Sequence, residues 1–193
     1  LPLFADGGGW TSQVILENPG DIPVNGTVQF YGPGSSGASG PLLNMMINGE
    51  IGSSFSYSIP PFGSTRLVTG SASSSVQIGS VRISAAAQGA VPQALAIFSY
   101  KVGGTTVSEA SVPLLASGLT FQTYVENSVT NQIQAGLAIS NPLPSPVTVN
   151  LEQRVALIAS PALSRRGWLA SGASLKRGGA MAAIATNDSL SAH

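Results

Sequence analysis

The side chains that most often carry out chemistry in proteins are scarce in this sequence. It contains no cysteine, and its one histidine is the last residue, His193. Disulfides and thiolate metal sites are therefore excluded. A Ser-His-Asp triad, a Cys-His pair and a zinc site with several histidines are not expected. The sequence predicts no catalytic residue, no metal site and no cofactor.

Paired carboxylates are the remaining route to acid-base chemistry. Glycoside hydrolysis needs two acids about 5–10 Å apart, but the eight acidic residues are scattered and no two lie within three residues of each other. Glu17, Glu109 and Glu126 lie in or beside predicted strands, where solvent-facing positions explain them. Asp6, before Gly7-Gly8-Gly9, could give one oxygen to Ca²⁺, which takes six to eight. A turn-forming Asp is the favoured interpretation.

Two further patterns suggest ligand binding. Residues 32–37 match G-x-G-x-x-G, but the dinucleotide motif needs a helix directly after it, and the run that follows, 38–41, cannot start one. We therefore expect a flexible loop. Tyr31, Tyr57 and Tyr100, together with Trp10, could form a surface on which sugar rings stack. Packing in the core is the commoner fate of such aromatics in small sandwiches.

Composition limits the class of protein. Hydrophobic residues make up 43% of the 193 positions, enough for a core, whereas charged residues make up only 8%, against about 25% in typical domains. Eight basic residues balance eight acidic ones, so the chain lacks the basic footprint of a nucleic-acid-binding protein. No run of 18 apolar residues predicts a membrane span. The chain begins Leu1-Pro2-Leu3 with no visible signal peptide, and we expect a piece of a longer precursor.

The elements that would position any site are strands. Residues 54–59 alternate strictly between serine and large apolar residues, which is typical of a strand with one buried face. Asn48-Gly49 favours a type I′ turn, so residues 42–59 are predicted to form a β-hairpin. A change of phase at Gly79-Ser80 suggests a β-bulge. About eight strands in the first module predict an immunoglobulin-like antiparallel β-sandwich. Its expected core residues are Trp10, Val14, Leu16, Val28, Phe30, Phe55, Tyr57, Ile59, Val81, Ile83, Leu95 and Ile97.

A repeat is visible at an offset of 123 residues. The segment from Trp10 to Asn18-Pro19 aligns with the segment from Ile133 to Asn141-Pro142. We predict a complete β-sandwich module over 1–116 and the start of a second, similar module over 117–152. Residues 153–193 carry five basic groups and one acid, with glycines that interrupt every long helix candidate. For them we predict an irregular Ala/Gly/Arg-rich tail.

The opening segment carries a family resemblance. Residues 4–13, FADGGGWTSQ, followed by Asn18-Pro19 and by GTVQF at 26–30, resemble the start of uncharacterised β-sandwich modules that are repeated or C-terminal in large secreted bacterial proteins. The resemblance covers residues 1–152. It implies an extracellular or cell-surface sandwich, and the family offers no assigned site residues to transfer.

These observations give two expectations for function. The first is a non-catalytic extracellular module with a structural or adhesive role in a larger secreted or surface protein. Its partners would be neighbouring domains of the same longer chain, a polysaccharide or another surface protein, with no nucleic acid. The alternative is a carbohydrate-binding module attached to a missing catalytic domain, with Tyr31, Tyr57 and Tyr100 as the stacking residues.

Overall fold

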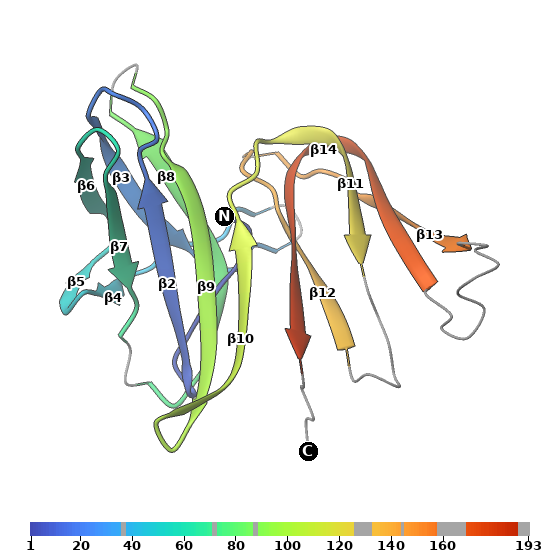
Figure 1. The fold of residues 1–193 in the computed structure, drawn as a ribbon, viewed down its shortest axis with the longest axis horizontal. Helices are drawn as coiled ribbons and strands as arrows, with labels where there is room; N and C mark the ends of the chain where they lie inside the picture. The colour runs from blue at the N-terminus through green and yellow to red at the C-terminus, as the bar shows by residue number, and fades with distance from the viewer. Residues whose placement is uncertain are drawn as a thin grey trace.

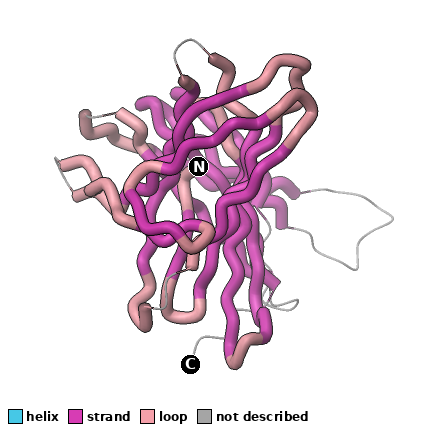
Figure 2. Tube along the Cα trace, turned by 90° about the vertical axis from the view of Figure 1, so that its left-hand side faces the viewer, coloured by secondary structure: helices cyan, strands magenta, loops and turns pink. Residues whose placement is uncertain are grey.

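The computed structural model consists of β-strands and loops (Figures 1 and 2). Within the residues that it describes there is no helix, and hence none that could cross a lipid bilayer. All strand pairings are antiparallel, which confirms the all-β prediction. The described residues are 1–35, 38–70, 73–86, 89–125, 133–143, 145–157 and 169–188.

The first ten strands build a β-sandwich, drawn on the left of Figure 1. One sheet has the order β1-β8-β3-β6, and the other has the order β10-β9-β2-β7. The short hairpin of β4 and β5 stands beside them. The predicted antiparallel sandwich is therefore confirmed. The bounds of these strands are β1 Phe4–Asp6, β2 Trp10–Glu17, β3 Val24–Tyr31, β4 Met45–Ile47, β5 Glu50–Gly52, β6 Phe55–Ile59, β7 Ser64–Val68, β8 Gln77–Ala85, β9 Gln93–Val102 and β10 Thr105–Pro113.

Aromatic rings occupy the centre of the core between the two sheets. Phe30 is fully buried, and its ring meets Phe4 edge-on at 5.2 Å and Phe55 at 6.1 Å. Such edge-to-face pairs add to the free energy gained by burying apolar area. Seven of the predicted core residues are buried: Val14, Leu16, Val28, Phe30, Tyr57, Ile59 and Val81. Three more are partly buried and pack against the core: Trp10, Phe55 and Ile83.

The prediction was wrong for the two core residues of β9. Leu95 and Ile97 are only half-buried, whereas Ala96 and Phe98 face the core. The cause is the register, because Val14 of β2 lies opposite Ala96, and residues directly opposite each other share a face of the sheet. Both faces of β9 carry apolar residues, so the sequence pattern alone could not choose between the two phases.

The turn at Asn48-Gly49 has the predicted geometry, but the hairpin around it is shorter than expected. Both residues have positive φ angles, 51° and 86°, as a type I′ turn requires. Only β4 and β5 pair across this turn, whereas β6 pairs with β3 in the sandwich. The predicted hairpin over 42–59 is therefore wrong outside residues 45–52, because β6 finds a longer partner strand.

The predicted bulge at Gly79-Ser80 is also absent. β8 runs without a register shift, pairing with β1 up to Gly79 and with β3 from Ser80 onwards. A Cβ atom at Gly79 would collide with the main-chain oxygen of Tyr31, so this close approach requires glycine. The change of phase arises because Ile78 points away from the core and lines a groove described below.

The remaining strands form a separate sheet, on the right of Figure 1. Its strands are β11 Gly118–Val125, β12 Ile133–Ser140, β13 Asn150–Leu157 and β14 Leu169–Asp188. β14 pairs with each of the other three. The prediction of an irregular tail over 153–193 is therefore wrong for the end of β13 and for 169–188, while 158–168 and 189–193 lie outside the described residues. Pairing uses main-chain groups, which alanine and glycine supply as well as β-branched residues do. The predicted boundary between two domains stays a prediction.

The packing of Phe30 gives the first testable prediction. Truncation of Phe30 to alanine removes a fully buried ring with two aromatic neighbours, so Phe30→Ala should lower the free energy of unfolding by about 3–5 kcal/mol. Phe62→Ala is the matched control, because the Phe62 side chain is 76% exposed. Urea denaturation measures both. Equal midpoints for the two variants would contradict this account of the core.

Candidate functional site

The structure does not bring the three candidate tyrosines together. Tyr57 is only 6% exposed and its hydroxyl donates to the main-chain oxygen of Ser84 at 3.2 Å. Burial raises the pKa of Tyr57. Tyr100 lies in the other sheet from Tyr57 and packs against Trp10 of the neighbouring strand, with ring centres 5.1 Å apart. Tyr57 therefore offers no face to a ligand, and the prediction of a stacking surface shared by all three tyrosines is wrong. Tyr31 alone faces a groove.

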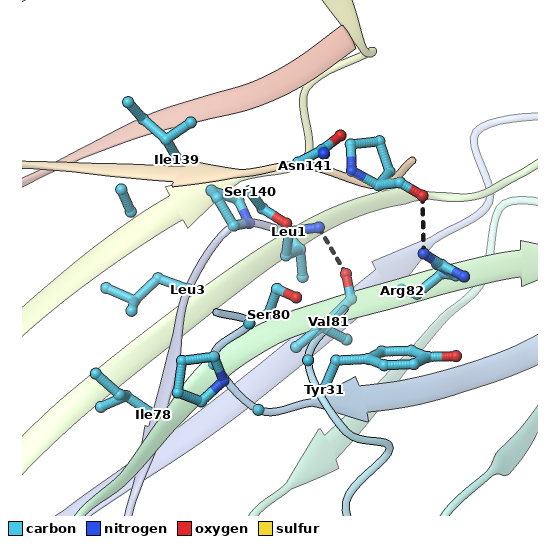
Figure 3. Close-up of a pocket in the computed structure, with 18 of the residues that line it drawn as sticks. Leu1, Leu3, Tyr31, Ile78, Ser80, Val81, Arg82, Ile139, Ser140 and Asn141 are labelled. Carbon is cyan, nitrogen blue, oxygen red and sulfur yellow. Dashed lines mark hydrogen bonds between the residues drawn. The ribbon is translucent and has the colours of Figure 1, made fainter. Parts of the chain in front are cut away.

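This groove, of about 1470 Å³, separates the sandwich from β12 and the turn after it (Figure 3). The sandwich contributes β8, the first residues of the chain and the loop after β3, whereas the far wall comes from residues 136–143 and 145–147. Most of its lining is apolar or carries hydroxyl groups. The apolar side chains include Leu1, Leu3, Ile78, Leu137, Ile139 and Val147.

Arg82 is the one charged side chain among the described residues that line the groove. Its guanidinium lies 4.9 Å from the centre of the Tyr31 ring, within the range of a cation–π interaction. The Tyr31 hydroxyl in turn donates to Gln29 Oε1 at 3.0 Å. Arg82 Nη2 donates to the main-chain oxygen of Pro142 at 3.0 Å, across the groove. Arg82 therefore connects the sandwich to the turn after β12.

Arg82 was not among the predicted site residues, although the sequence contains a signal for it. Val81 and Ile83 mark the core face of β8, which places Arg82 on the outward face. Arg82 lies opposite Gln29 in the register of β8 with β3, and Tyr31 follows two positions along the same face. The three side chains could have been grouped from the sequence only if the pairing of β3 with β8 had been known.

The turn that meets Arg82 is built around Asn141. Asn141 Nδ2 donates to the main-chain oxygen of Ser145 at 2.7 Å, and Asn141 Oδ1 accepts from the main-chain nitrogen of Leu143 at 3.0 Å. An asparagine that bonds its own main chain in this way fixes a turn. The turn holds the carbonyl of Pro142 towards the guanidinium.

Asn18 builds the same turn in the sandwich. Asn18 Nδ2 donates to the oxygen of Ile22 at 2.8 Å, and Asn18 Oδ1 accepts from the nitrogen of Gly20 at 3.0 Å. These partners lie four and two residues ahead, as they do for Asn141. β2 and β12, the strands that precede the two turns, are both eight residues long. The repeat seen in the sequence is thus accompanied by the same local geometry.

The chain start forms part of the groove wall. The Leu1 nitrogen donates to the main-chain oxygen of Val81 at 2.8 Å, and the Val81 nitrogen donates back to the Leu1 oxygen at 2.9 Å. These two hydrogen bonds hold the first residues of the chain against β8, on the wall of the groove.

The loop that matches G-x-G-x-x-G borders the same groove but is followed by no helix among the described residues. The Gly32 nitrogen donates to the oxygen of Pro41 at 2.9 Å, and Ser35 and Ala38 exchange two main-chain hydrogen bonds of 3.1 Å. Residues 36 and 37 lie outside the described residues. The flanks of this loop thus pair with each other and present no helix N-terminus to a phosphate.

The acidic candidates do not form a catalytic pair. Glu109 Oε2 accepts a hydrogen bond from Ser99 Oγ at 2.7 Å, across the pairing of β9 with β10. This hydrogen bond joins two neighbouring strands of the same sheet. Glu17 is exposed at the end of β2, Asp6 precedes the turn of residues 7–9, and Glu126 lies outside the described residues. No three acidic or histidine side chains in the described part of the chain are grouped to hold a metal ion.

No known protein family, curated protein or solved structure matches this chain. The resemblance to secreted bacterial modules therefore stays a prediction. What the chain does must be inferred from the groove and from the two asparagine turns.

The two turns differ in burial, which gives the second testable prediction. Asn18 is 2% exposed and also donates to the oxygens of Ile59 and Pro60, at 3.3 and 3.0 Å. Asn18→Ala removes the donor to the buried carbonyl of Ile59 and to two part-buried carbonyls, and should cost about 2–4 kcal/mol of unfolding free energy. Asn141→Ala, at an exposed turn, should cost less than about 1 kcal/mol. Chemical denaturation measures both, and equal losses would contradict the structural role of Asn18.

Proposed function

We propose that the chain is a non-catalytic structural module of a secreted or cell-surface protein. In this proposal, one β-sandwich repeat is fixed to the next by a turn that rests on an outward sheet face. The observation that carries it is the hydrogen bond from Arg82 to the carbonyl of Pro142. That bond joins the sandwich to a turn that the chain builds twice, at Asn18 and at Asn141.

The chemistry of the groove supports a connecting role over a catalytic one. General acid-base catalysis needs a group that titrates near the working pH. A guanidinium stays protonated in proteins, and the other described side chains that line the groove are apolar, hydroxyl or amide groups. Such a lining suits a lasting contact between two protein surfaces. The secreted or surface location rests on the sequence resemblance.

One observation favours the alternative of carbohydrate binding. Tyr31, Arg82 and the hydroxyls of Ser80 and Ser84 all border the groove, and an aromatic ring beside hydrogen-bonding groups is suited to a sugar ring. The guanidinium of Arg82 already covers the Tyr31 ring, which argues against the stacking of a sugar on that ring. The structural role is therefore the better supported of the two.

A double spin-label experiment tests the structural proposal. The chain contains no cysteine, so Thr106→Cys and Thr148→Cys give two unique labels at exposed positions, one on β10 of the sandwich and one after the Asn141 turn. We expect a narrow distance distribution between the labels. Arg82→Ala should broaden it by removing the donor to Pro142, and Asn141→Ala should broaden it by loosening the turn. Arg66→Ala is the control, because Arg66 bonds Gln13 within the sandwich.

A distribution that is equally narrow in all four chains would contradict the proposed coupling. Broadening by Arg66→Ala as well would point to a general effect of charge rather than to the contact with Pro142.

The carbohydrate alternative and the absence of catalysis share one experiment. The chain should migrate unchanged in affinity electrophoresis through a panel of neutral and acidic polysaccharides, and it should hydrolyse none of them above the buffer rate. Retardation that is lost in Tyr31→Ala would replace the structural proposal with carbohydrate binding. Turnover that is lost in Glu109→Gln would show an enzyme.

A further inference from the structure

Among the residues that the structure describes, none meets the turn at Asn18 in the way that Arg82 meets the turn at Asn141. The Asn141 turn lies against the face of Arg82, Tyr31 and Ile78. The equivalent residues of the first turn, Pro19 to Pro23, are all exposed, and Ile22 is 71% exposed. A rigid turn of the same design is therefore displayed at one end of the sandwich.

Phe62 enlarges this exposed turn. The Phe62 nitrogen donates to the oxygen of Gly20 at 3.1 Å, so the loop between β6 and β7 is bonded to the Asn18 turn. Phe62 has a φ angle of 55°, in a turn closed by a hydrogen bond from the Gly63 nitrogen to the Pro60 oxygen at 3.0 Å. A phenylalanine in the left-handed region costs about 1 kcal/mol or more, and glycine is the usual residue at this position of a turn.

Strain and exposure together point to a contact. A backbone held in an unfavourable region is found most often at functional sites, and an exposed apolar pair on fixed loops resembles the anchors of protein interfaces. Phe62 is 76% exposed and Ile22 is 71% exposed. Nothing within the sandwich explains why a large apolar ring stands at this strained position.

The charges of the two loops indicate which surface they fit. Residues 18–23 and 60–63 contain one acidic residue, the exposed Asp21, and no basic residue. The face on which the Asn141 turn rests carries Arg82 as its one charged side chain, beside apolar residues such as Ile78. An apolar turn with a single acid is thus complementary to an apolar face with a single guanidinium.

We propose that the Asn18 turn, with Ile22 and Phe62, docks onto the Arg82–Tyr31–Ile78 face of a second copy of this repeat. The carbonyl of Pro19 takes the place of the carbonyl of Pro142, and the two exposed apolar side chains cover the apolar part of the face. The turn and the face are different surfaces of one module, so the contact is heterologous and can extend into an open array. The inference rests on the proposed function, because it extends the contact within the chain to a contact between copies.

The face of a second copy is open only when its own Asn141 turn is displaced. The experiment therefore uses the full chain with Asn141→Ala, whose spin-label distance distribution shows directly whether the face has opened. We expect this variant to associate at high concentration in sedimentation equilibrium, while the unsubstituted chain stays monomeric.

Two further chains identify the surfaces. Adding Ile22→Ser and Phe62→Ser to Asn141→Ala should weaken the association constant by about ten-fold or more, which corresponds to about 1.4 kcal/mol. Adding Arg82→Ala to Asn141→Ala should also weaken the association constant, because it alters the face onto which the turn docks. Ile22→Ser and Phe62→Ser in the unsubstituted background control for folding, because both side chains are exposed.

Each outcome decides. If Asn141→Ala leaves the label distances narrow, the proposed function fails, and this inference fails with it. If the distances broaden but the chain stays monomeric, only the docking of a second copy is wrong. Association that persists unchanged without Ile22 and Phe62 would also overturn the inference, since it would show nonspecific contact through the exposed groove.

Discussion

The sandwich depends on one buried amide at the place where the chain twice crosses between the sheets. Asn18 follows β2 in one sheet and leads to β3 in the other, and its side chain also bonds the carbonyls of Ile59 and Pro60, where β6 gives way to β7. Both crossings are therefore fixed to each other. The register of β2 with β7 begins at Glu17 opposite Ser64, directly beside this amide. Because a slip of one residue would turn every side chain to the wrong face, a side chain that holds both crossings also protects the core.

A second constraint comes from β8, which serves two apolar surfaces. Val81 faces the core, whereas Ile78 faces the groove. Side chains alternate between the two faces of a strand, so β8 can supply apolar residues to the core and to the groove only if its apolar pattern changes phase. The change falls at Gly79, where the absence of a side chain lets the carbonyl of Tyr31 come close. The same strand then presents Arg82 outward to the Pro142 carbonyl. The core of the sandwich and the contact with the turn after β12 are thus both encoded within residues 78–82.

Much of the sandwich could be predicted from the sequence because strand alternation and turn residues are local signals. Asn48-Gly49 turns where expected, and both residues have positive φ angles. Leu95 and Ile97 were assigned to the wrong face because the phase of a strand with apolar residues on both faces is set by its partner, which is distant in sequence. Arg82 was missed for a related reason, since its site exists only after β3 and β8 pair. β14 was missed because small residues carry almost no strand preference of their own.

The pairings of the first strands also set the order in which the chain can fold. Phe4 lies opposite Gly79, and Trp10 lies opposite Tyr100. During synthesis, β1 must therefore wait for β8, and β2 must wait for β7 on one side and for β9 on the other. Contacts this distant in sequence make folding slow, in the range of milliseconds to seconds. During that interval β2 is an unpaired strand with alternating apolar residues, which is the kind of segment that associates with other chains. β2 lies in the middle of the finished sheet, so until its two neighbours have formed it is also the strand most exposed to association with other chains.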